Sequence, residues 1–159
     1  MYPRLEQNGI IIDVSHLSDK GFSDVCAVSK KPFIATHSNA RKICSHKRNL
    51  LDEQIVEIIK RKGLIGLNFY HTFLNNSPKS ACADDILRHA EHILSLGGEN
   101  SLAIGTDFDG AEIISEFDND NKLLGLEKLF LDNGFSKKLT QKIVYTNANN
   151  FFNTYHKDV

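Results

Sequence analysis

The chain has 159 residues, of which 41% are hydrophobic and 25% charged, a composition typical of a folded soluble domain and not of a disordered segment. Lys and Arg number 19 against 20 Asp and Glu, and this net charge of −1 argues against nucleic-acid and membrane-surface binding. No apolar run approaches the roughly 20 residues of a membrane span. Three widely spaced cysteines without a CxxC pair, and a start that lacks a signal-peptide pattern, predict a cytoplasmic protein.

The first half of the chain alternates short apolar runs with amphipathic stretches. A β-branched run predicts a strand that starts near residue 10, and Ser18 is the expected cap of a helix that extends to Val28. A second short strand is expected over 33–36, with a polar loop behind it. Isoleucines at i, i+3 and i+4 then predict an amphipathic helix from Asp52 to Lys62.

The second half continues the same alternation. An apolar run predicts a third strand over 64–69, and a loop rich in Asn, Ser and Pro follows it. A helix is expected over 84–96 and a fourth strand over 102–106. Two closing helices are expected over 124–132 and 137–151.

The order of these elements predicts an α/β fold with parallel strands. Strand starts near 10, 33, 64 and 102 leave enough residues between them for a crossover helix each time. Near-continuous apolar strands agree with this arrangement, because parallel strands are usually covered on both faces.

Polar side chains capable of metal binding or proton transfer follow each predicted strand. They are His16, His37, the Asn68–Tyr70 segment and Asp107. In parallel α/β folds ligands bind beyond the carboxyl ends of the strands, and neighbouring strands lie about 4.8 Å apart. Two imidazoles at adjacent strand ends can therefore share one zinc ion, with Asp107 close enough to accept a proton from water. This pattern predicts metal-assisted hydrolysis.

Simpler interpretations of the same residues stay open. A histidine at a strand end is often only a hydrogen-bonded loop residue. The Asp107-Phe-Asp-Gly segment is equally typical of a turn. Asp13 lies three residues before His16 and on a regular strand faces the other side, where it is expected to accept backbone or outer-layer hydrogen bonds around a site.

The remaining candidates have weaker patterns. Arg48 belongs to a small basic cluster that is either a surface patch or, beside a metal site, a clamp for a substrate carboxylate. His89 and His92 stand at i and i+3 on a helix, where a solvated or packed face is the favoured interpretation. Cys44 has no neighbouring base and is not proposed as a nucleophile.

Five ordered motifs together resemble a known family. Gly-Ile-Ile-Ile-Asp-Val-Ser-His-Leu-Ser, Pro-Phe-Ile-Ala-Thr-His-Ser-Asn-Ala, Arg-Asn, Gly-Leu-Asn-Phe-Tyr and Ile-Gly-Thr-Asp-Phe-Asp-Gly start at positions 9, 32, 48, 66 and 104. Over essentially the whole chain, the sequence closely resembles the membrane (renal-type) dipeptidase family of zinc peptidases.

The resemblance implies a (β/α)8 barrel with a binuclear zinc centre that hydrolyses dipeptides, often with a D-residue at the C-terminal position. By position, His16 and His37 would ligate the second zinc. Arg48 would bind the free carboxylate of the dipeptide. Asp107 would contact the bridging water or the substrate amino group and act as the acid/base residue.

The match covers only part of the family pattern. A His-x-Asp pair, a bridging glutamate and a further substrate-binding histidine of the family all precede the matched region. Residues 1–159 are therefore expected to form a single C-terminal half-barrel domain, the (βα)4 half with strands five to eight of a TIM-type barrel. Such a half holds at most one partly liganded zinc.

A four-stranded half-barrel is expected to expose two sheet edges and an apolar inner face. We therefore expect association with a separate N-terminal half-barrel or with a second copy of the chain. The alternatives are a non-catalytic half-barrel that serves as an interaction subunit, and a mononuclear hydrolase closed by homodimerisation.

Overall fold

Four short parallel segments form the centre of the molecule in the computed structural model, which describes residues 2–155. β1 (Ile65–Leu67) pairs in parallel with β2 (Leu102–Ile104), with Ile65 opposite Leu102. The segments around Asp13 and Ile34 add to the same edge through single parallel bridges, Asp13 to Ile34 and Ala35 to Ile65. The predicted parallel order therefore holds, although the first two predicted strands are bridges and not full strands.

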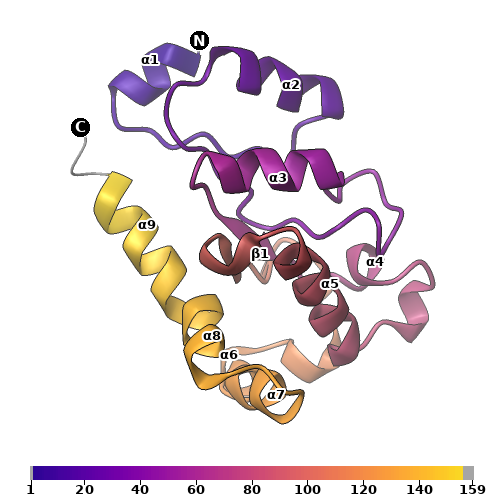
Figure 1. Ribbon diagram of the computed structural model, residues 1–159. Coiled ribbons are helices and arrows are strands. Elements are labelled where there is room, and N and C mark those ends of the chain that lie inside the picture. The colour runs from indigo at the N-terminus through magenta and orange to yellow at the C-terminus, as the bar shows by residue number, and fades with distance from the viewer. Residues whose placement is uncertain (1, 156–159) are drawn as a thin grey trace.

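Three helices, α2 (Asp19–Val28), α3 (Asp52–Lys60) and α5 (Ala83–Ser95), cover one face of these segments (Figure 1). Helix α2 begins directly after Ser18, whose hydroxyl accepts a hydrogen bond from the Gly21 amide, as the capping pattern predicts. The bounds are α1 Tyr2–Gln7, α2 Asp19–Val28, α3 Asp52–Lys60, α4 His71–Leu74 and α5 Ala83–Ser95, with 3-10 turns at Pro78–Ser80 and Gly98–Asn100.

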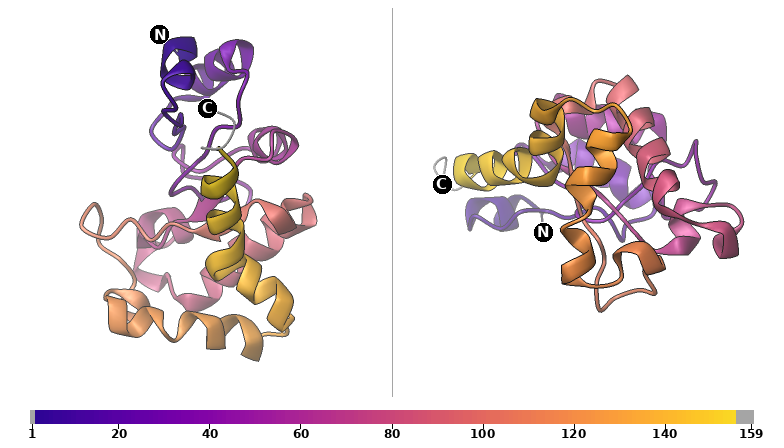
Figure 2. Two further views of the ribbon diagram at one scale, coloured as in Figure 1. Left: turned by 90° about the vertical axis from the view of Figure 1, so that its left-hand side faces the viewer. Right: turned by 90° about the horizontal axis from the view of Figure 1, so that it is seen from below.

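The second half ends in a run of helices that passes along the strands. Figure 2 shows α9 lying along one side of the molecule and ending near the N-terminal segment, where the Tyr155 hydroxyl donates to the Ile10 carbonyl at 3.3 Å. The bounds are α6 Asp120–Leu123, α7 Leu126–Asp132, α8 Lys137–Gln141, a π-helical stretch Lys142–Thr146 and α9 Asn147–Tyr155, preceded by a 3-10 turn at Ser115–Phe117.

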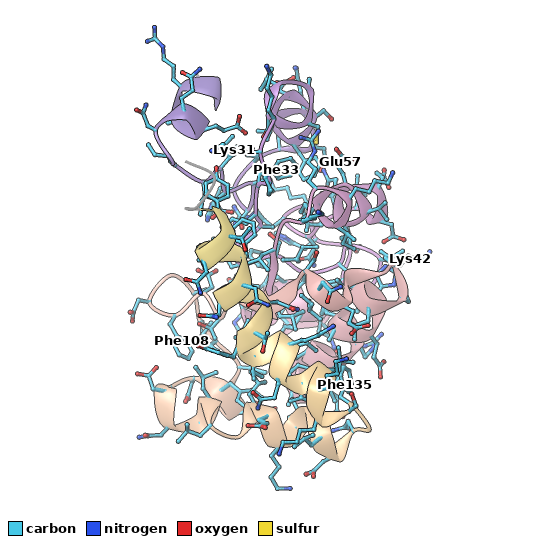
Figure 3. All side chains as sticks on the ribbon, turned by 60° about the vertical axis from the view of Figure 1, so that its left-hand side comes forward. Lys31, Phe33, Lys42, Glu57, Phe108 and Phe135 are labelled. Carbon is cyan, nitrogen blue, oxygen red and sulfur yellow. The ribbon has the colours of Figure 1, made fainter. Side chains whose placement is uncertain are left out.

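The main hydrophobic core lies between the strands and helices α2, α3 and α5. Alternate residues of the strands, such as Ile65 and Leu67, face the isoleucines of α3 and α5 and are fully buried. Phe33 is also fully buried and lies close to α2 and α3 (Figure 3). Its ring is edge-on to the ring of Phe22 in α2, with the two ring centroids 5.6 Å apart. This core fixes the strands and directs their carboxyl ends to one edge.

The opposite, inner face of the strands has two regions, one at each end of the strands. Near the amino ends, Ile34, Leu64 and Ala103 are buried and pack against Ala148 and Phe151 of α9. The expectation of an exposed apolar inner face is wrong for these residues, because α9 returns over them. Near the carboxyl ends the inner face is polar.

Within residues 2–155, the helices are all too short or too polar to cross a membrane.

Candidate functional site

His16 and His37 meet at the carboxyl ends of the first two strand segments. Their Nε2 atoms are 2.9 Å apart, and their ring centroids are 4.9 Å apart in an edge-on arrangement. The two histidines come from neighbouring strands whose register is set by the Asp13–Ile34 bridge. The structure thus brings together the two imidazoles that the sequence pattern placed at one edge.

Arg48 extends from the loop after the second strand segment to the same point. Its Nη1 donates to His16 Nδ1 at 2.7 Å, and its guanidinium carbon lies 5.7 Å from the centre of the Phe73 ring. Arg48 Nε is buried and has no hydrogen-bond partner among the described residues. Since a guanidinium only donates, His16 Nδ1 must be the acceptor, and the proton of the neutral ring then lies on Nε2.

Asp107 completes the cluster from the end of β2. Its backbone φ of 68° is left-handed, and its Oδ2 accepts a hydrogen bond from Asn68 Nδ2 at 3.0 Å. Asn68 is fully buried, and its backbone amide donates to the side chain of Asn39 at 3.0 Å. The Asp107 carboxylate is therefore held by a rigid partner at the end of β1.

Of these residues, His16, Arg48 and Asp107 line a cavity of about 540 Å³. It contains one guanidinium and two carboxylates, those of Asp107 and Glu112, and the rings of Tyr70 and Phe73 form part of its wall. Glu112 also pairs with His71, at 3.2 Å. Tyr70 belongs to the Asn68–Tyr70 segment predicted at the end of the third strand, whereas the sequence analysis missed Phe73 and Glu112 as lining residues.

A second cavity, of about 460 Å³, lies at the opposite ends of the strands. Its wall includes Lys62, Leu64 and Phe151 and is built largely by α9. None of the residues singled out for chemistry in the sequence lies there, so the carboxyl-end cavity is the candidate site.

His37 and Asp13 have shifted protonation equilibria. Burial lowers the pKa of His37; the carboxylates of Asp107 and Asp13 act against it, while His16 and Arg48 add to the lowering. The pKa of Asp13 lies below its usual value, because hydrogen bonds from Thr36 and Ser15 outweigh desolvation by the surrounding chain. At neutral pH, His37 is therefore a neutral imidazole and Asp13 an ionised carboxylate.

The other candidates of the sequence lie away from the site. His89 is fully buried, where its Nδ1 accepts from the Ala40 amide at 3.1 Å and its Nε2 lies 3.0 Å from the Leu74 carbonyl oxygen. His92 is 2.7 Å from Asp52. Cys44 is buried, and burial raises the pKa of its thiol. Among residues 2–155, no group of three His, Cys, Asp or Glu side chains is arranged to hold a metal.

The fold and the site define an α/β protein whose polar cluster lies at the carboxyl ends of parallel strands. The chain belongs to the membrane dipeptidase family (peptidase family M19), whose family model matches residues 3–156. This membership confirms the resemblance seen in the motifs, and the family consists of metallopeptidases.

Individual relatives agree with the family assignment. A metallopeptidase from Rhodobacter sphaeroides, solved with a phosphinate mimic of the dipeptide L-Ala-D-Ala, is 32% identical with a TM-score of 0.91, over 96% of this chain and 44% of that chain. Dipeptidase tcpJ from Claviceps purpurea is 28% identical over 93% of this chain and 35% of its own length. An uncharacterized protein in the pqqA 5′ region of Klebsiella pneumoniae is 32% identical over 86% of this chain and 51% of its own length. The chain therefore spans about half or less of the length of these relatives.

Proposed function

We propose that the chain forms the C-terminal (βα)4 half of a TIM-type barrel, with strands five to eight, in a zinc-dependent dipeptidase. The observation that carries the proposal is the convergence of His16, His37 and Asp107 at one edge, with Arg48 beside them. Solved relatives cover 95% and 96% of this chain at TM-scores of 0.90 and 0.91, but only 46% and 44% of their own chains. This ratio supports the half-barrel assignment.

The donor set fits a zinc ion. The Nε2 atoms of His16 and His37 face one another at 2.9 Å, and neutral imidazole nitrogen is a common zinc ligand. Two ligands leave a zinc ion short of the three that catalytic sites usually have. We therefore propose that the remaining ligands of this zinc, and all ligands of the other zinc of the family site, come from residues outside the described chain.

The residues of the chain have distinct roles in the proposed reaction. Zinc supplies Lewis acidity toward the peptide carbonyl and toward water. The Arg48 guanidinium binds the free carboxylate of the dipeptide, for which its planar donors are suited. Asp107, held by Asn68, contacts the substrate amino group or accepts a proton from the attacking water.

Arg48 and His16 are linked in this scheme. When His16 Nε2 acts as a ligand, its proton must lie on Nδ1, and a protonated Nδ1 no longer accepts from Arg48. The guanidinium is then available to the substrate carboxylate at the same cavity wall. In this scheme, Arg48 bonds to His16 only while His16 Nε2 is not bound to zinc.

The rest of the barrel is proposed to come from a separate N-terminal half-barrel or a second copy of this chain. The segment around Asp13 and strand β2 lie at the two edges of the parallel set, and within the described residues neither edge carries a further parallel neighbour. A cytoplasmic location remains part of this proposal on the composition alone.

Zinc content and hydrolysis of L-Ala-D-Ala by the purified chain test the function. We expect close to one zinc per chain, lost in His16→Ala and retained in His92→Ala, a matched histidine outside the cavity. Hydrolysis that depends on Arg48 and Asp107 would support the enzyme. Zinc binding without hydrolysis would favour the interaction-subunit alternative, and neither zinc nor hydrolysis would contradict the proposal.

A further inference from the structure

Behind His37, on the side of the ring away from His16, a chain of hydrogen bonds leads to a carboxylate. His37 Nδ1 lies 2.7 Å from the hydroxyl of Thr36, and that hydroxyl donates to Asp13 Oδ2 at 2.5 Å. Asp13 Oδ1 accepts from the Thr36 amide at 3.1 Å and from the Ser15 hydroxyl at 2.8 Å. The Asp13 side chain thus connects the first two strand segments directly below the two histidines.

The direction of each hydrogen bond in this chain is determined. The ionised Asp13 carboxylate only accepts, so the single hydroxyl proton of Thr36 goes to Asp13. The Thr36 oxygen is then an acceptor toward His37, and Nδ1 must carry the ring proton. The lone pair of the neutral His37 ring therefore lies on Nε2, which points to His16.

The backbone of Thr36 is fixed on the other side by two glycines. A Cβ atom at Gly66 would lie 2.0 Å from the Thr36 carbonyl oxygen, and a Cβ atom at Gly105 would lie 1.8 Å from it. Only residues without a side chain allow this close approach of strands. The Thr36 backbone is thus held between the Asp13 carboxylate and the two glycines, which fixes its position beneath His37.

We propose that Asp13 and Thr36 are positioning residues that hold the His37 imidazole as the Nδ1–H tautomer, with its Nε2 lone pair directed into the site. For zinc binding the inference rests on the proposed function, since metal-ligating histidines usually depend on such an outer partner. The tautomer itself does not depend on a metal and can be measured separately.

Long-range proton–nitrogen NMR spectra of the 15N-histidine-labelled chain, recorded without metal, test the inference. The His37 signals, assigned by their loss in His37→Ala, are expected to show the Nδ1–H pattern. Thr36→Val removes the hydroxyl at nearly constant shape and should shift His37 toward the Nε2–H tautomer. Asp13→Asn should do the same, because the amide can donate to Thr36 and release the hydroxyl proton to His37.

Zinc affinity, measured by competition with a chromophoric chelator, is the second readout. Thr36→Val and Asp13→Asn should each weaken zinc binding about 10- to 100-fold. Thr140→Val is the matched control, since the hydroxyl of this buried threonine has no partner among the described residues. It should change neither the tautomer nor the affinity.

The outcomes separate this inference from the proposed function. An Nε2–H tautomer in the unmodified chain, or a tautomer and zinc affinity in Thr36→Val equal to those of Thr140→Val, would overturn the inference. The expected tautomer shifts in a chain that binds no zinc would support the positioning role and contradict the zinc-dependent function.

Discussion

Buried asparagines and one buried histidine attach the loops of the candidate site to the strands. Asn39 donates to the Asn68 carbonyl at 2.9 Å, and Asn49 donates to the Phe73 carbonyl at 2.9 Å. His89 ties the loop at Ala40 to the end of α4. Since these side chains are buried, water does not compete for these hydrogen bonds, which attach the loops to the strands.

The His89 environment gives the stability a specific pH dependence. Burial lowers the pKa of His89 in the folded chain to about 4, whereas in the unfolded chain it is about 6.5. Between these pH values the unfolded chain therefore binds a proton at His89 that the folded chain does not bind. Its contribution is therefore fully present above pH 6.5 and is lost as the pH falls toward 4. Between pH 7 and pH 5 we expect a loss of about 2 kcal/mol from this residue.

Urea unfolding of the chain and of His89→Gln at both pH values measures this loss. The glutamine amide can still accept from Ala40 and donate to Leu74, yet it does not titrate. The variant should therefore lack about 2 kcal/mol of the acid-side decrease, whereas His92→Gln should keep it. Equal acid-side losses in the chain and in His89→Gln would show that His89 is not the group responsible.

At the scale of elements, hydrophobic periodicity predicted the longer helices well and missed several of the short ones. The helices expected to start at Ser18 and at Asp52 correspond to α2 and α3. Helices α1, α4 and α6 were missed, because four to six residues are too few to show a repeat of 3.6. The segments near residues 10 and 33 look like strands in sequence but form only bridges.

Gly105 is the position in the strands where substitution is expected to do most damage. A Cβ there would overlap the Thr36 carbonyl oxygen and lie 3.0 Å from the Gly66 Cα, both of them backbone atoms that cannot yield. Gly105→Ala should therefore destabilise the chain by more than about 3 kcal/mol, or prevent folding.

Gly97→Ala is the matched control. Gly97 has a φ of 94°, and a Cβ there would meet no atom within 4 Å, so only the left-handed backbone opposes alanine, at about 1 kcal/mol. Thermal and urea unfolding compare the two variants. Similar stabilities would mean that the strands do not approach one another as described.

For the whole molecule, the sequence predicted which residues converge at the site better than it predicted which face of the strands is covered. Parallel topology alone brings His16, His37 and Asp107 to one edge, so their convergence followed from the order of elements. The Thr36 hydroxyl could not be assigned, because its partners depend on strand register and side-chain rotamer. The cover that α9 provides for the inner face was likewise invisible, since periodicity does not say where a helix packs.

The position of the core predicts how zinc affects folding. Most buried apolar residues form one cluster between the strands and the outer helices, and a smaller cluster packs under α9, so apolar burial holds the fold together without the histidine pair. We therefore expect the fold to form without a metal. Chelation should leave the far-ultraviolet circular dichroism spectrum unchanged. If only the folded chain binds zinc, the unfolding free energy should rise by about 1.4 kcal/mol for each tenfold increase in the free zinc concentration above the dissociation constant.

Thermal unfolding across a zinc titration, with and without chelator, measures both effects. His16→Ala should fold with the same spectrum and show no zinc-dependent rise in Tm, because it leaves a single histidine at the site. His92→Ala should rise as the unmodified chain does, since it retains both site histidines. Loss of helical structure on chelation would instead mean that the metal organises the fold, as in small zinc-dependent domains. A rise that persists in His16→Ala would locate the zinc elsewhere on the chain.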